Sequence, residues 1–356
     1  MVQFHEMRVI EVFKTTRDAV VIRLVIDKGI DFTPGQYLTF RKTLRGQEIR
    51  RSYSICSSKN DKFLQVAIKR VEGGIFSNWA NTELKPGDIL QSMVPMGNFY
   101  SKPIHGIVHS LAFAGGSGIT PILSILKAEL ENDTESKFTL VYSNHHSNTM
   151  MFREELEDLK NLYMTRLNLV HIFTDESQEN GLFSGRLTNQ KLGQIFKYLI
   201  NINSLTTIYI CGPDAMMSEI TNTLIDHGIK KEFIRREYFK SEQGIKPQIV
   251  KPIGKELTTI NNGVKFKVTL DGRMRAFENN GNVSLLQAAL ENNIEAPYAC
   301  QAGVCSTCKA KVLKGDVEML SNNALEDHEV ERGFVLTCQA YPKSDEVIWD
   351  YDQGYQ

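Results

Sequence analysis

The sequence predicts three successive domains: an antiparallel β-barrel, a doubly wound α/β domain with a parallel sheet, and a smaller α+β domain at the C-terminus. Three observations support this order. β-rich runs separated by turn residues fill residues 1–104, strands alternate with helices over residues 105–240, and four cysteines gather after residue 299. A chain of 356 residues provides ample core for such an architecture. We therefore expect domains at 1–104, 105–240 and 263–356, with 241–262 as a Pro- and Gly-containing linker.

The first domain contains two short motifs that could bind a ligand. Residues 20–26 and 65–71 are β-rich, and the turns Pro34-Gly35 and Pro86-Gly87 fall between strands. Alternation along a strand at 50–55 places Arg51 and Tyr53 on one face, beside Ser54. That face suits an aromatic ring system and a phosphate. Gly74 and Ser77 open the next helix, whose free N–H groups suit a pyrophosphate. A surface strand and a plain helix cap are the alternatives.

The second domain is predicted from strand–helix alternation. A strand at 108–114 leads into Gly115, Gly116, Gly118 and Thr120, where bare backbone at a helix N-terminus favours a pyrophosphate. The expected helices are 122–130, 152–162, 190–200 and 214–227, and the further strands are 138–142, 168–173 and 207–211. Residues 106–126 lack charge over 21 positions, but glycines interrupt them, so we expect a buried strand and helix and no membrane insertion.

The C-terminal domain is organised around four cysteines. Cys300, Cys305 and Cys308 follow a C-x4-C-x2-C spacing, and Cys338 follows after 29 intervening residues. This spacing is the plant-type [2Fe–2S] pattern, in which four thiolates complete the two irons. A zinc site and two disulfides are the alternatives, but zinc sites usually show two short cysteine pairs.

The last ninety or so residues resemble plant-type ferredoxins, because a strand at 266–270 and a helix at 284–290 precede the cysteine loop. The resemblance implies a β-grasp fold. Residues 51–54, 74–77 and 95–99 likewise resemble the ferredoxin–NADP reductase superfamily, as do 115–121, 209–216 and 237–239. That resemblance implies FAD contacts at Arg51, Tyr53, Ser54, Gly74 and Ser77, and NAD(P)H contacts at Gly115, Gly116, Gly118, Thr120, Cys211, Gly212 and Pro213. It places Glu237 and Phe239 near the flavin, and Tyr53, Ser54, Cys211 and Glu237 at the hydride-transfer site. For Cys211, a buried strand end is the alternative.

The domain order resembles the reductase components of multicomponent oxygenases, most of all those of the phenylacetyl-CoA epoxidase type. This resemblance implies a path from NAD(P)H through FAD and the [2Fe–2S] cluster to an oxygenase, here a di-iron monooxygenase. A flavin can mediate between NAD(P)H, which gives two electrons together, and the cluster, which takes one at a time, because a flavin can hold one or two electrons. Two alternatives remain: a module serving a desaturase, hydroxylase or other acceptor, and a zinc-bearing flavin reductase.

The choice of nicotinamide cofactor depends on the residues that follow the second strand of the α/β domain. Asn144 and His145 stand there without an arginine, and Arg186 lies in a segment that matches the family's S-G-R motif. Because no carboxylate ends this strand to bind a ribose hydroxyl, we expect NADPH, with NADH as the alternative.

The charge of the chain and the character of its N-terminus indicate which partners and which cell compartment to expect. The whole chain carries a net charge of −1, and this charge does not indicate a nucleic-acid-binding protein. Residues 263–356 contain nine Lys and Arg against 14 Asp and Glu, an acidic domain suited to electrostatic docking. The N-terminus has no apolar core of signal-peptide length, so we expect a cytoplasmic protein.

Overall fold

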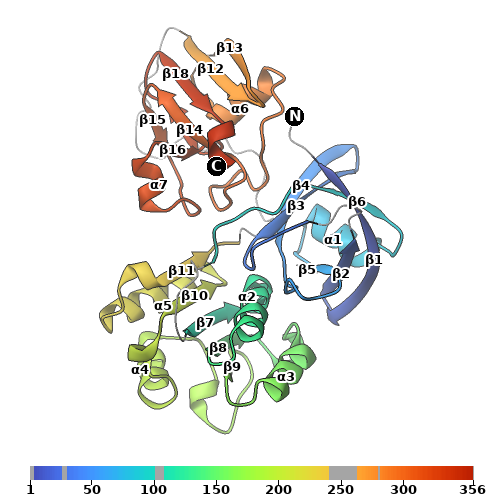
Figure 1. The fold of residues 1–356 in the computed structure, drawn as a ribbon, viewed down its shortest axis with the longest axis vertical. Coiled ribbons are helices and arrows are strands. Elements are labelled where there is room, and N and C mark those ends of the chain that lie inside the picture. Colours follow the sequence, from blue (N-terminus) through green and yellow to red (C-terminus); the bar gives the residue numbers. More distant parts are fainter. Residues whose placement is uncertain (1–3, 26–29, 101–107, 240–262, 280, 356) are drawn as a thin grey trace. The chain divides into compact units, whose positions relative to one another are not determined.

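The computed structural model describes residues 4–25, 30–100, 108–239, 263–279 and 281–355 (Figure 1). The predicted linker at 241–262 lies outside these residues. The chain separates into two compact units, a larger one with nearly all of residues 5–239 and a smaller one centred on the residues from 263 onward. Within the described part of the chain, no helix is both long and apolar enough to cross a membrane.

An antiparallel sheet of six strands forms the first domain, as predicted. The strands are β1 (His5–Thr16), β2 (Ala19–Val25), β3 (Tyr37–Leu44), β4 (Gln47–Ser54), β5 (Leu64–Lys69) and β6 (Ile89–Ser92). They follow the order β4-β3-β6-β1-β2-β5. Ile55, just past β4, bridges to Val66 in β5, and this closes the barrel. Helix α1 (Ile75–Thr82) buries Phe76 in the barrel core against Phe40.

The second domain is a parallel sheet with helices on both faces. Its strands are β7 (His109–Gly115), β8 (Lys137–Asn144), β9 (Leu167–Phe173), β10 (Thr207–Cys211) and β11 (Ile234–Glu237), in the order β11-β10-β7-β8-β9. The α-helices are α2 (Ile119–Asn132), α3 (Arg153–Leu162), α4 (Asn189–Tyr198) and α5 (Asp214–Asp226). Short 3-10 helices are η1 (Gly116–Gly118), η2 (Ser147–Thr149), η3 (Gly181–Phe183), η4 (Ile202–Ser204) and η5 (Lys231–Phe233). One core packs α2 and α3 on the sheet, and a second packs α4 and α5 on its other face. The observed helices and strands lie within a few residues of those predicted.

Polar contacts and a shared core join these two domains within the larger unit. Ser124 in α2 donates a hydrogen bond to the backbone carbonyl of Ser57 at 2.6 Å. The buried ammonium of Lys127 pairs with Asp61 at 3.0 Å and with Glu155 of α3. Cys56, just past β4, is 2% exposed in this core. Because paired buried charges are costly to separate, the contacts hold the barrel and the α/β domain in a defined relation.

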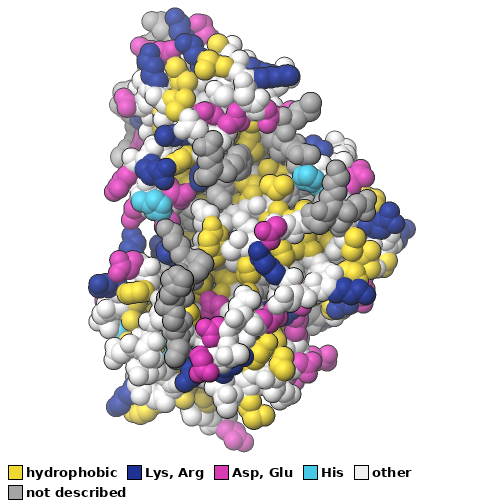
Figure 2. All heavy atoms as spheres, viewed as in Figure 1, with side chains coloured by type: hydrophobic (Ala, Val, Ile, Leu, Met, Phe, Trp, Pro, Cys, Tyr) yellow, Lys and Arg dark blue, Asp and Glu magenta, His cyan; other side chains and the backbone are white. Residues whose placement is uncertain are grey.

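The smaller unit has the predicted β-grasp arrangement. A mixed five-stranded sheet orders β12 (Val264–Leu270), β13 (Arg273–Asn279), β14 (Lys309–Lys314), β16 (Phe334–Leu336) and β18 (Glu346–Asp350) as β13-β12-β18-β14-β16. β12 and β18 run parallel, and α6 (Leu285–Glu291) packs its apolar face on the sheet around Trp349. A ribbon of β15 (Val317–Met319) and β17 (Ala340–Pro342), helix α7 (Asp327–Glu331) and η6 (Asp352–Tyr355) complete the unit. On the face shown in Figure 2, Lys and Arg side chains are interspersed with Asp and Glu.

Candidate functional site

The four predicted iron ligands converge in the smaller unit. Cys300, Cys305 and Cys308 lie in the loop before β14, and Cys338 lies between β16 and β17. The Cys305 thiol donates to the Cys300 sulfur at 3.0 Å, and Cys338 is within hydrogen-bonding reach of Cys300 and Cys308. Cys305, Cys308 and Cys338 are buried, and Cys300 is half-buried.

Backbone geometry explains how the loop surrounds this position. Gln301 and Gly303 adopt positive φ of 50° and 74°. A Cβ on Gly303 would lie 2.6 Å from the Ser321 carbonyl oxygen, so this turn requires glycine. The Ala302 N–H points at the Cys300 sulfur at 3.4 Å. Hydrogen bonds from the Cys305 and Cys338 thiols, with the Ala302 and Val304 amides, hold the pKa of Cys300 well below its usual range.

This donor set fits a two-iron cluster. Four thiols supply two ligands to each iron, and amide donors aimed at sulfur are the contacts that such clusters use. Within the described ranges, no group of three or more His, Cys, Asp or Glu side chains has the spacing of a site for one metal ion. Cys300, Cys305, Cys308 and Cys338 would therefore hold a [2Fe–2S] group through their thiolates.

The predicted flavin-binding strand is β4 of the barrel. Arg51 and Tyr53 are both half-buried at alternate positions, as the strand period requires. The Arg51 guanidinium donates to the Arg50 carbonyl at 2.8 Å. The Tyr53 ring lies 5.5 Å from Phe76, which in turn contacts Trp79 at 5.4 Å. Aromatic surface beside a guanidinium fits a flavin with its phosphate.

Helix α1 begins at the predicted pyrophosphate motif. Gly74 is the N-cap and has no side chain to cap the helix, and Gly73 before it has φ of +74°. A Cβ at Gly73 would meet no atom within 4 Å, so the turn is open on that side. The buried Ser77 hydroxyl accepts a hydrogen bond from the Val71 N–H at 3.3 Å. An uncapped helix start with open space fits a phosphate group.

Three predicted residues from distant parts of the chain meet at one point. The Ser54 hydroxyl donates to the Glu237 carboxylate at 3.1 Å, across 183 positions of sequence. Glu237 ends β11 and is the register partner of Cys211, which ends β10. Burial raises the pKa of Glu237 to about 8, although the hydrogen bond from Ser54 opposes this. Burial, and then the charge of Glu237, raise the pKa of Cys211, so its thiol stays protonated.

Glycines bring the two nucleotide loops into close contact. A Cβ on Gly118 would lie 2.1 Å from the Cys211 carbonyl oxygen, and one on Gly212 would lie 3.0 Å from Gly115. Gly115 itself lies against Pro213. Thr120 donates to the Ser117 carbonyl at 3.0 Å and so fixes the start of α2. The predicted NAD(P)H segments are thus packed together at the carboxyl ends of β7 and β10, where doubly wound sheets bind nucleotides.

Comparison with known proteins accounts for all three domains. Residues 6–100 match the oxidoreductase FAD-binding domain, residues 113–222 the oxidoreductase NAD-binding domain, and residues 268–343 the 2Fe-2S iron-sulfur cluster binding domain. One of the subunits of 1,2-phenylacetyl-CoA epoxidase from Escherichia coli (strain K12) is 40% identical over 99% of both chains. The chain belongs to the family of oxygenase reductase components. It is an NAD(P)H oxidoreductase with FAD-binding, NAD-binding and 2Fe-2S domains.

Two further comparisons concern a second relative of the reductase and a solved structure with its fold. The ferredoxin reductase component of 3-ketosteroid-9-alpha-monooxygenase from Mycolicibacterium smegmatis (strain ATCC 700084 / mc(2)155) is 30% identical over 98% of this chain and 97% of its own. The solved structure of phthalate dioxygenase reductase has the same fold, with a TM-score of 0.59 and 21% identity over 98% of both chains.

The reductase's predicted 2′-phosphate residues lie at the other end of the carboxyl edge of the sheet, beside β8 and β9. Asn144 ends β8, and its buried Nδ2 has no hydrogen-bond partner. Gly185 donates from its backbone N–H to the carbonyl of Phe173 at 2.8 Å, which brings the exposed Arg186 beside the end of β9. The sites at β10–β11 and β8–β9 lie on opposite sides of β7, as a dinucleotide laid across the edge requires.

Sequence reasoning missed two carboxylates at this position. Asp175 follows β9 and accepts a hydrogen bond from His145 Nδ1 at 2.9 Å, and this contact holds its pKa below the usual range. Glu176 accepts from the Ser147 N–H at 2.8 Å. Both carboxylates could have been found, because neighbouring parallel strands end at the same edge of the sheet. They add negative charge where a 2′-phosphate is expected.

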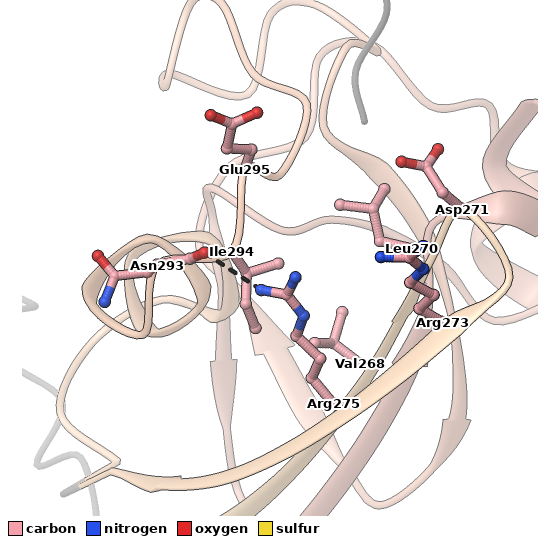
Figure 3. Close-up of a pocket in the computed structure, with 8 residues that line it drawn as sticks. All are labelled: Val268, Leu270, Asp271, Arg273, Arg275, Asn293, Ile294 and Glu295. Atoms are coloured by element: carbon pink, nitrogen blue, oxygen red, sulfur yellow. Dashed lines mark hydrogen bonds between the residues drawn. The ribbon is translucent and has the colours of Figure 1, made fainter.

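A separate cavity of about 430 Å³ lies in the smaller unit (Figure 3). It is lined by β12, β13 and the turn after α6, through Val268, Leu270, Asp271, Arg273, Arg275, Asn293, Ile294 and Glu295. Arg275 points toward the turn and donates to the Asn293 carbonyl at 3.2 Å. None of the eight is a predicted site residue, and we assign the cavity no part in electron transfer.

Proposed function

We propose that this reductase passes electrons from NAD(P)H to a phenylacetyl-CoA epoxidase-like di-iron monooxygenase, and that it acts in the cytoplasm. The observation that carries the proposal is the 40% identity with the Escherichia coli epoxidase component, which extends over 99% of both chains. An identity spread over all three domains supports a shared role more strongly than a match to one domain would.

Residues of the barrel and of the α/β domain support the hydride-transfer step. FAD, when bound, would supply the conversion between a two-electron hydride transfer and single-electron transfers. Tyr53 and Arg51 would hold the flavin ring and phosphate, and Gly74 and Ser77 would hold the pyrophosphate. Cys211 and Glu237 present a neutral surface beside the reacting rings, since both carry protons at pH 7. Ser54 orients the Glu237 carboxyl. We assign Phe239, an exposed side chain two residues past Glu237, to the same region.

The residues at the ends of β8 and β9 determine the preference for NADPH or NADH. Asn144, His145 and Arg186 support NADPH, because they supply an amide, an imidazole and a guanidinium near one another in the fold. Asp175 opposes it, because a carboxylate repels a 2′-phosphate and accepts well from a ribose hydroxyl. We retain NADPH as the proposed donor, with use of NADH, and expect the preference to be modest.

A second candidate acceptor has its own support. The relative from 3-ketosteroid-9-alpha-monooxygenase is 30% identical over nearly its whole length. The same three domains are therefore found in reductases whose oxygenases differ. A desaturase or hydroxylase, with no CoA substrate, is the corresponding alternative acceptor for this chain.

The test is reoxidation of the reduced protein by purified acceptors. The holoprotein is reduced with NADPH without oxygen and mixed with the oxygenase component of phenylacetyl-CoA epoxidase, while the visible iron–sulfur absorption is followed. We expect rapid reoxidation and epoxide formation from phenylacetyl-CoA once oxygen is added. Reoxidation by a 3-ketosteroid oxygenase component, with none by the epoxidase component, would refute the acceptor assignment and leave the reductase assignment intact.

A further inference from the structure

A buried tyrosine near the C-terminus joins two segments that carry predicted iron ligands. The Tyr351 hydroxyl donates to Thr337 Oγ1 at 3.0 Å. Thr337 in turn donates twice to the Cys308 carbonyl, from its hydroxyl at 2.9 Å and from its N–H at 3.1 Å. Both Tyr351 and Thr337 are completely buried. Thr337 directly precedes Cys338, so the chain of hydrogen bonds connects the Cys308 segment to the Cys338 segment.

The segment that contains Tyr351 is itself firmly held. The Tyr351 N–H donates to the Thr269 carbonyl at 3.0 Å, and the Asp352 carboxylate accepts from the N–H groups of Asp271 and Gly272, each at 2.7 Å. Gly354 lies against the backbone that follows Cys308, where a Cβ would come within 2.4 Å of the Lys309 carbonyl oxygen. The C-terminal segment is therefore fixed both to the turn between β12 and β13 and to the start of β14.

We propose that Tyr351 is a positioning residue for the iron–sulfur ligands, and that its hydroxyl acts through Thr337 to set the environment of Cys308 and Cys338. This inference rests on the assignment of the four cysteines as ligands of a [2Fe–2S] group. Tyr351 touches none of the four sulfurs in a hydrogen bond and acts only through its neighbour.

The physical effect follows from the direction of the hydrogen bonds. The carbonyl oxygen of Cys308 accepts two hydrogen bonds from Thr337. These donors offset its partial negative charge and so lower the free-energy cost of adding an electron to a cluster nearby. Tyr351 donates to the Thr337 hydroxyl oxygen and so fixes which way that hydroxyl points. Without it, Thr337 Oγ1 is a buried acceptor with no donor, and its hydroxyl can turn away from Cys308. The reduced state is then less stabilised, and the link between the two ligand segments is weaker.

The test uses the full-length holoprotein and five variants. Tyr351→Phe removes only the hydroxyl, whereas Thr337→Val removes the intermediate donor and Thr337→Ser keeps it. The double variant Tyr351→Phe/Thr337→Val asks whether the tyrosine acts through the threonine. Tyr341→Phe is the matched control, since Tyr341 lies three residues after Cys338 in β17 and takes no part in these hydrogen bonds. Midpoint potential by spectroelectrochemical titration, and the rate of bleaching by a chelator, are the two readouts.

We expect Tyr351→Phe to lower the midpoint potential and to speed bleaching several-fold. Tyr341→Phe and Thr337→Ser should match the wild type, and the double variant should match Thr337→Val, since coupled residues are not additive. A Tyr351→Phe protein with wild-type potential and bleaching rate would overturn the inference, as would additive effects in the double variant. If the wild-type protein showed no iron–sulfur absorption, the cluster assignment would fail and this inference with it.

Discussion

Replacing Glu237 by glutamine tests the charge state of the proposed hydride-transfer site. Glu237 is half-buried, accepts a hydrogen bond from Ser54 at 3.1 Å and stands beside Cys211 in the sheet. Burial raises its pKa to about 8, so at pH 7 the protonated form exceeds the ionised form by about tenfold. Glutamine copies the protonated carboxyl in shape and in lack of charge. The variant therefore removes a titration while keeping the contacts.

The magnitude follows from proton linkage. In the unfolded chain a glutamate titrates near 4.3, so between about pH 4.3 and 8 the folded state holds a proton that the unfolded state has released. The free energy of unfolding then falls as pH rises, by about 1.4 kcal/mol per pH unit. Between pH 5.5 and 7.5, ionisation of Glu237 alone should lower the free energy of unfolding of the wild-type protein by about 2.5 kcal/mol. Water reaching a half-buried carboxyl reduces the effect, so we expect at least about 1 kcal/mol.

The assay is urea unfolding of the larger unit in the holoprotein, followed by release of bound flavin, at pH 5.5 and 7.5. Other groups titrate equally in both proteins, so the difference between their pH dependences isolates Glu237. The Glu232→Gln variant makes the same substitution at an exposed position in η5 and serves as control. Glu237→Gln should lose less stability than wild type or control between these pH values, and should keep flavin reduction by NADPH at pH 7. Equal pH dependence in all three proteins would refute the raised pKa and the neutral surface inferred from it.

Three further predictions concern the cofactors. Cys305→Ser should abolish the iron–sulfur absorption while flavin-dependent ferricyanide reduction persists; loss of both from a folded, flavin-containing protein would refute the division of roles between the domains. Arg51→Ala should weaken flavin binding by about 1.5–3 kcal/mol, seen as flavin loss on dialysis, and the released flavin should be FAD by HPLC; unchanged retention would contradict the phosphate contact. Asp175→Asn should raise the ratio of kcat/KM for NADPH over NADH, by about 1 kcal/mol at low salt.

The sequence by itself determined the features that depend on local pattern. Spacing alone singled out the four cysteines, because a cluster loop needs its ligands at short fixed separations. Alternation of strands and helices predicted the parallel sheet, and the glycine runs marked the turns where backbone approaches backbone. These signals are local, since each arises from the conformation of a few neighbouring residues.

Contacts between distant segments were decided only by the tertiary structure. The hydrogen bond from Ser54 to Glu237 depends on how the barrel docks on the α/β domain, and that depends on buried partners such as Lys127 and Asp61. The carboxylate of Asp175 meets His145 because β8 and β9 are neighbours in the sheet, an order that residue pattern alone does not encode. The hydroxyl of Tyr351 reaches Thr337 only once the C-terminal segment has packed on β14. Such pairings are set by strand order and by the packing of whole domains, which sum many weak contacts along the chain, and so no short stretch of sequence carries them.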